Sequence, residues 1–263
     1  QQNGLRGEAL AGIVGCCCCL SSWAQTAVSA ESAEEIVLRQ VVDPDHAARF
    51  GRLPMQSSAG RMMPINTFSS ELLRKLHKSD RYEQLNGDQF LLSLLAMPET
   101  WVRVPLIAFS NQALANYYEL STPACAYVEL FDTNGHYKLQ ERLEAAYAKM
   151  PAQRNAFDKD LIKLDEQINI FHQLIRYQWL PIFPLRGDPA HKWYAPGEDL
   201  SAFSGKDSLF VSQIMGWYLQ EVREGLKTDD WKKADEVLAM IDTYQHAQEE
   251  ILDIRPAKME AEI

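Results

Sequence analysis

Apolar residues recur at intervals of three and four through the middle of the chain. The first run is spaced 4, 3 and 4 and comprises Leu139, Leu143, Ala146 and Met150. The second is spaced 4, 3, 4, 3 and 4 and comprises Phe157, Leu161, Leu164, Ile168, Phe171 and Ile175. This spacing places side chains on one helix face, and the register continues across Pro151. We therefore expect a long helix kinked at the proline, or two helices nearly in line, rather than a tight hairpin.

A β-hairpin is predicted near residue 53. The segments "RLPMQ" and "GRMMPI" flank "SSAG", which places Gly60 at the turn. Pro64 ends the extended run, and Thr67 is expected to cap the helix that follows.

Further patterns complete a mainly α-helical prediction. An apolar helix in "GDQFLLSLLAM" ends at Pro98, an extended segment lies near 104–109, and "NQALANYYEL" is helical. Two helices at about 208–226 and 230–252, joined by "KTDD", form a C-terminal helical hairpin.

The N-terminal region divides the chain into three parts. Residues 1–30 contain an apolar stretch from Leu10 to Ala24 with four consecutive cysteines, Cys16 to Cys19, and are interpreted as the remnant of a transmembrane or signal segment. Residues 31–49 are polar and are expected to be a linker, and residues 50–263 form the helical domain. The alternative is a stand-alone helical adaptor lipoprotein anchored through Cys16 in "IVGC", and either interpretation places the domain outside the cytoplasm.

The net charge of −10 argues against sequence-independent nucleic-acid binding by the whole chain. Residues 49–78 nevertheless carry six basic residues against one acid. This basic stretch suggests an anionic neighbour, either lipid headgroups, a carboxylate-bearing ligand or a partner protein, and chance clustering on a solvated surface is an equal alternative.

The sequence contains no pattern typical of a catalytic or metal site. The six histidines are scattered without metal-ligand spacing, and Cys125 has no cysteine partner in the helical domain, so neither a bound metal nor a disulfide is predicted. The Pro-rich segment around Trp193 is expected to cap the core, with a binding or membrane-interface role as the alternative.

The segment "GRMMPINTFSSELLRKL" (60–76) resembles the "GR-x-x-P-x-N-T" signature of a large extracytoplasmic domain. That domain occurs in fused cytochrome c biogenesis proteins of the ResB/CcsA type, the System II cytochrome c synthases, in Bacteroides-like bacteria. The similarity continues in order through "DQFLLSLLAMPETWVRVPLI", "FDTNGHYKL", "FDKDLIKLDEQINIF", "LPIFP" and "DWKKADEVLAMIDTYQ". It covers about residues 50–263.

The resemblance implies a periplasmic domain of an inner-membrane protein that assists haem delivery and covalent attachment to apocytochrome c. The parent protein would be a synthase (a lyase) that handles haem in its membrane part, whereas this segment would bind no cofactor and carry no catalytic residue. Its expected partners are apocytochrome c, the membrane-embedded part of the synthase and an anionic membrane surface, and not nucleic acid.

Five residues are candidates for contact with a ligand or partner: Arg61, Asn66, Thr67, Arg74 and Trp193. Arg61 could hold a carboxylate through a bidentate contact. The structural alternative is that Thr67 caps a helix and Asn66 forms a turn, with Arg61 holding the same turn.

Overall fold

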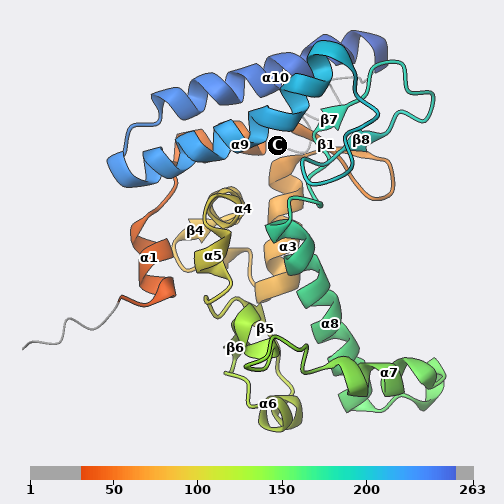
Figure 1. Ribbon diagram of the computed structural model, residues 1–263. Helices are drawn as coiled ribbons and strands as arrows, with labels where there is room; N and C mark the ends of the chain where they lie inside the picture. Colours follow the sequence, from red (N-terminus) through yellow and green to blue (C-terminus); the bar gives the residue numbers. More distant parts are fainter. Residues whose placement is uncertain (1–30, 253–263) are drawn as a thin grey trace, which may run out of the picture. The chain divides into compact units, whose positions relative to one another are not determined.

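The computed structural model describes residues 31–252 and confirms a mainly helical fold with small two-stranded antiparallel sheets (Figure 1). The helices are α1 (Ala33–Arg39), α2 (Pro44–Gly51), α3 (Ile65–His77), α4 (Gly87–Ala96), α5 (Pro98–Trp101), α6 (Gln112–Tyr118), α7 (Gln140–Ala148), α8 (Ala156–Ile175), α9 (Gly205–Thr228) and α10 (Lys232–Leu252), with 3₁₀ turns η1 (Tyr127–Leu130) and η2 (Pro151–Gln153). The strands are β1 (Pro54–Gln56), β2 (Met62–Pro64), β3 (Arg81–Tyr82), β4 (Leu85–Asn86), β5 (Ile107–Ala108), β6 (Ala124–Cys125), β7 (Phe183–Pro184) and β8 (Trp193–Tyr194).

The predicted hairpin is present as the antiparallel pair β1 and β2, in which Met55 lies opposite Met63. Gly60 has a φ of +78° in the turn, a conformation that favours glycine. The expected extended segment near 104–109 contains the short strand β5, which pairs with β6. The predicted C-terminal helical hairpin is formed by α9 and α10.

Helix α3 begins earlier than the sequence suggested, so the expectation that Thr67 caps it is wrong. Pro64 occupies the cap position without a side-chain hydrogen bond, and Thr67 already lies within the first turn. Ile65 is fully buried, and its amide donates to the Leu53 carbonyl. Because these contacts fix Ile65, the helix starts directly after β2. It therefore begins two residues before Thr67, whose hydroxyl would favour the cap position.

Residues 31–49 are not the expected linker, because they fold as α1 and α2 and belong to the compact unit that begins at Glu31. Ser32 and Glu35 form a capping box at α1, and Asp43 caps α2 just before Pro44. Apolar side chains from this segment are buried in the main core: Val37, Val42 and Ala47. These helices have only seven and eight residues, which is too short for a clear helical period of apolar positions to show in the sequence.

The central apolar stripe forms two helices that turn back on each other, so the expectation of a nearly straight arrangement is wrong. The Tyr147 hydroxyl lies 3.5 Å from an Asp165 carboxylate oxygen, and Lys149 lies 2.7 Å from Asp158. In one continuous helix, positions 18 residues apart would be separated by about 27 Å. Pro151 opens η2 and Asn155 caps α8, so the turn is encoded between them. The predicted helix over 157–175 is confirmed as α8.

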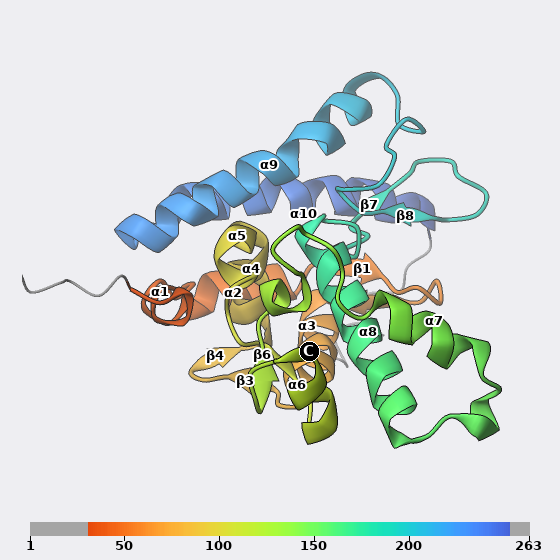
Figure 2. The same cartoon turned by 60° about the horizontal axis from the view of Figure 1, so that its bottom comes forward.

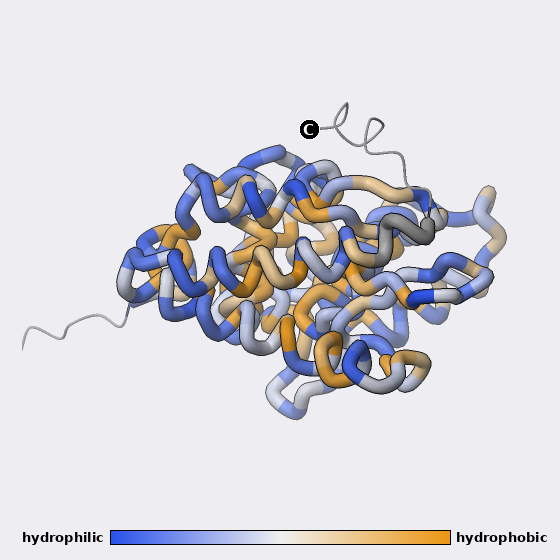
Figure 3. The backbone as a smooth tube through the Cα atoms, turned by 90° about the horizontal axis from the view of Figure 1, so that it is seen from above, coloured by the Kyte–Doolittle hydropathy of each residue, from blue (hydrophilic) through white to orange (hydrophobic). Residues whose placement is uncertain are grey.

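The described region contains two hydrophobic clusters. The larger one is built by α1 to α5, the second half of α8 and the α9–α10 hairpin, and the smaller one by β5, β6, α6, α7 and the first half of α8. Helices α9 and α10 lie side by side along one side of the larger cluster (Figures 1 and 2). Figure 3 shows hydrophobic positions gathered between the helices and hydrophilic ones along the outer turns.

None of the helices between residues 31 and 252 combines the length and the hydropathy needed to cross a lipid bilayer. The segment Leu10 to Ala24, the four cysteines and the predicted boundary at residue 30 lie outside the described residues.

Two glycines of α9 predict opposite effects of the same substitution. A Cβ at Gly216 would meet no atom within 4 Å, whereas a Cβ at Gly225 would lie 2.9 Å from the Trp231 ring. We expect Gly216→Ala to raise the free energy of unfolding by about 0.5–1 kcal/mol through helix propensity. Gly225→Ala should lower it by about 1–2 kcal/mol because the buried ring must move. Urea unfolding of both variants measures this, and equal effects would contradict the packing of the α9–α10 hairpin.

Candidate functional site

The structure does not gather the two arginine candidates at one place. Arg61 is exposed in the turn between β1 and β2, where its amide donates to the Ser57 hydroxyl. Arg74 is exposed in the last turn of α3. The 13-residue helix α3 lies between them in the chain, and a helix of that length is about 20 Å long.

The other three candidates lie near the start of α3 and in the Pro-rich loop. Asn66 and Thr67 are half-buried in the first turn of α3, where the Thr67 hydroxyl donates to the Asn66 side-chain oxygen. Trp193 is only 2% exposed, in agreement with a core-capping role. Its amide donates to the Gln56 side chain, which ties β8 to the hairpin that carries Arg61. A contact of these residues with a ligand or partner stays a prediction.

Part of the basic stretch is engaged within the domain. Arg49 pairs with Asp235 at 2.6 Å, and Lys75 lies 3.8 Å from Glu166. Exposed Arg52 and Arg74 lie at the ends of α2 and α3. The positive charge is therefore spread over several elements and is partly neutralised.

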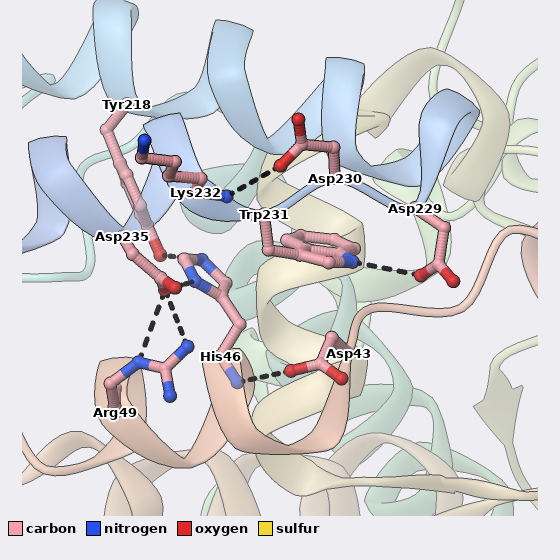
Figure 4. Close-up of polar contacts among 9 residues, drawn as sticks. All are labelled: Asp43, His46, Arg49, Tyr218, Asp229, Asp230, Trp231, Lys232 and Asp235. Atoms are coloured by element: carbon pink, nitrogen blue, oxygen red, sulfur yellow. Dashed lines mark hydrogen bonds and ion pairs between the residues drawn. The ribbon is translucent and has the colours of Figure 1, made fainter.

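The structure brings together four side chains that the sequence analysis did not group. His46 of α2 lies between Asp235 of α10 and Tyr218 of α9 (Figure 4). Its Nδ1 is 2.6 Å from Asp235 Oδ1, and its Nε2 is 2.9 Å from the Tyr218 hydroxyl. Arg49 donates to the same Asp235 oxygen from Nη2 at 2.6 Å and from Nε at 3.2 Å. We call these four residues the His46 cluster.

Neighbouring groups fix the orientation of the His46 cluster. The Trp231 ring lies 5.0 Å from the imidazole between ring centroids, and Trp231 Nε1 donates to Asp229 (Figure 4). Asp43, which caps α2, accepts the His46 backbone amide. The ionised carboxylate of Asp235 can only accept hydrogen bonds. A neutral His46 therefore donates a hydrogen bond from Nδ1 to Asp235 and accepts one at Nε2 from the Tyr218 hydroxyl.

Burial and charge shift the acidities of the cluster. Desolvation lowers the pKa of His46 against the opposing influence of Asp235. Burial raises the pKa of Tyr218 far above its usual range. Desolvation also acts to raise the pKa of Asp235, but hydrogen bonds from His46 and Arg49 outweigh it, and the pKa of Asp235 ends below its usual value.

The arrangement is suited to holding helices together rather than to reacting with a substrate. His46 and Tyr218 have no exposed surface, so a solute cannot reach them. A tyrosine with a raised pKa is also a poor nucleophile, although it stands beside a His–Asp pair. The cluster therefore joins α2 to the α9–α10 hairpin across 189 residues of sequence.

Within residues 31–252, no group of three or more His, Cys, Asp or Glu side chains is placed to hold a metal ion. Cys125 is a buried free thiol, and burial raises its pKa to about 12. A thiol in this state is unreactive at neutral pH.

The lowered pKa of His46 predicts acid sensitivity. In the unfolded chain this histidine takes up a proton near pH 6.5, whereas the folded state keeps it neutral to lower pH. The unfolded state then binds more protons, so the contribution of His46 is complete above about pH 6.5 and is lost as the pH falls below that value. We expect unfolding free energies from urea titrations to fall as the pH drops below about 6.5, by at most about 1.4 kcal/mol per pH unit from this group. His46→Gln should flatten that dependence, and an unchanged slope would contradict the assignment.

Comparison with known proteins gives one informative similarity. The sequence matches no established protein family profile. It is 30% identical over 215 residues to Protein NrfI of Wolinella succinogenes, a match that covers 81% of this chain and 23% of NrfI. The chain therefore spans about a quarter of the length of the relative that it resembles.

Proposed function

We propose that this chain is a domain of a cytochrome c maturation protein and assists covalent attachment of haem to apocytochrome c. The observation that carries the proposal is the similarity to NrfI along four fifths of the chain. That similarity supports a role in cytochrome c biogenesis in general. The assignment to a fused ResB/CcsA-type System II synthase rests further on the ordered segments between Gly60 and Gln245.

The domain is proposed to act without catalytic residues of its own. Its match to 23% of NrfI supports a division of labour in which haem handling and chemistry belong to the remainder of a longer protein. The burial of His46 and Tyr218 is consistent with a structural role for the His46 cluster. Haem is accordingly assigned to the parent protein and not to this domain.

The proposed location is the periplasmic side of the inner membrane. It rests on the resemblance and on the apolar segment Leu10 to Ala24. The alternative anchor at Cys16 falls on that same segment, outside the described residues. Exposed Arg52 and Arg74 support contact with anionic headgroups or with the membrane part of the synthase.

Binding of apocytochrome c tests the proposed role directly. The purified chain would be titrated with reduced, haem-free cytochrome c, with the same protein after haem attachment, and with a variant whose two haem-binding cysteines are alanine. The proposal predicts that the apo form binds at least about tenfold more tightly than the holo form. Equal binding of apo and holo forms, or no binding of either, would remove the proposed partner.

Arg61→Ala separates a partner contact from a structural role. Because Arg61 is exposed, we expect the free energy of unfolding to change by no more than about 0.5 kcal/mol, while cytochrome c maturation by the parent protein falls. Arg176→Ala, which removes an exposed arginine outside the basic stretch, is the matched control and should leave maturation unchanged. A parallel loss of stability and maturation in Arg61→Ala would instead assign Arg61 to the hairpin structure.

A further inference from the structure

A cavity of about 650 Å³ lies beside the smaller hydrophobic cluster, between the end of α3, the β5–β6 pair and α8. These elements surround the β5 label in Figure 1. Its lining includes Lys78 at the end of α3, Phe109 and Pro123 beside the β5–β6 pair, and Asp160, Lys163 and Gln167 of α8. A space of this size accommodates a small organic molecule.

Hydrogen bonds between elements hold the walls of this cavity in place. His77 donates from Nδ1 to the Leu106 carbonyl at 3.0 Å. Gln167, only 3% exposed, donates to the carbonyls of Lys75 at 2.9 Å and Ala108 at 3.2 Å, which ties α8 to both α3 and β5. Asn111 donates to Asp160 at 2.9 Å and thereby joins the start of α6 to α8. The cavity is therefore preformed, and a ligand would not have to order its walls.

The charged groups of the lining favour an anion. The charged residues of the lining are two lysines, Lys78 and Lys163, and one aspartate, Asp160, which forms an ion pair with Lys163. Asp160 accepts hydrogen bonds from Asn111 and, at 3.3 Å, from Lys163. Lys78 donates to a backbone carbonyl, that of Lys75, at 3.2 Å, so this contact does not neutralise its charge. The lining thus keeps a net positive charge in a chain whose net charge is −10.

The adjacent cavity shows that this positive charge is local. It measures about 560 Å³ and shares His77, Pro123 and Ala124 with the first. Its charged lining residues are instead mostly acidic: Glu34, Glu83, Glu129 and a single arginine, Arg103. Of these two neighbouring spaces, an anion would therefore enter the first.

We infer that the cavity between α3, β5 and α8 binds a small amphipathic carboxylate. The apolar body of the ligand would lie against Phe109 and Pro123, and its carboxylate would meet the ammonium groups of Lys78 and Lys163. This inference stands independently of the role in cytochrome c maturation.

A matched pair of ligands and a matched pair of lysines test the inference. The full chain would be titrated with 1-naphthylacetate and with neutral 1-naphthylacetamide, which differ only in the charged group, and binding would be followed by calorimetry and by amide chemical shifts. The carboxylate should bind at least about tenfold more tightly than the amide, with shifts concentrated in β5, β6 and the first half of α8.

The double variant Lys78→Met, Lys163→Met should lose that discrimination. Lys159→Met, one turn earlier on α8 at an exposed position outside the lining, should bind the carboxylate within about twofold of the unaltered chain. The inference is overturned by equal binding of acid and amide, by no binding up to about 10 mM, or by an equal effect of Lys159→Met.

Discussion

A chain that begins at residue 50 is expected to lose its cooperative unfolding transition, whereas a chain that begins at Glu31 should retain it. The segment 31–49 supplies Val37, Val42 and Ala47 to the larger hydrophobic cluster. It also supplies His46 and Arg49 to the contacts with Asp235. Full burial of one valine is worth about 1.5–3 kcal/mol, so losing the whole segment should cost more than about 5 kcal/mol. That is comparable to the entire stability of an ordinary domain.

Thermal and urea unfolding of the two chains, followed by far-UV circular dichroism and tryptophan fluorescence, measures this difference. The chain from residue 31 should show one transition that coincides for both probes. The chain from residue 50 should retain helical signal with a broad transition or none. Equal midpoints for the two chains would show that α1 and α2 are a dispensable attachment.

His46→Ala is expected to lower the free energy of unfolding by about 2–4 kcal/mol. The substitution leaves a space beside the Trp231 ring and removes the partner of the buried Tyr218 hydroxyl. Both the cavity and the unsatisfied hydroxyl are costly in a core. Arg49 and Asp235 keep their own ion pair, which limits the loss.

His172→Ala is the control for this prediction. His172 is exposed and makes one side-chain hydrogen bond, to the Tyr127 hydroxyl. Its removal should change the unfolding free energy by less than about 1 kcal/mol. Similar losses in His46→Ala and His172→Ala would mean that the His46 cluster contributes nothing beyond an ordinary surface contact.

The sequence was informative where a signal is local. The hairpin around Gly60, helix α8 and the α9–α10 pair follow from turn residues and from apolar spacing within one element. The arrangement of α7 and α8 does not, because an unbroken 3/4 register arises equally from one helix or from two helices that bury the same face. The break is local in origin, but it depends on Asn155 capping α8 as well as on Pro151.

The His46 cluster could not be predicted in this way, because its residues come from distant parts of the sequence. His46 and Asp235 are 189 positions apart, and no sequence pattern links the two, so only the packing of α2 against the α9–α10 hairpin brings them together. The cap at Asp43 and Pro44 was readable in the sequence and could have marked the start of α2. The basic stretch was visible as a charge pattern, but the pairing of Arg49 with Asp235 was not.

Covalent haem on a reporter cytochrome c, in cells that depend on the parent protein, is the most direct measurement of the proposed role in haem attachment. Residues 31–252 would be replaced by a flexible glycine–serine linker, and haem staining of the reporter would be normalised to the amount of parent protein in the membrane. The account predicts that haem attachment falls at least about tenfold while the parent protein still reaches the membrane. Undiminished haem attachment by the shortened protein would contradict it.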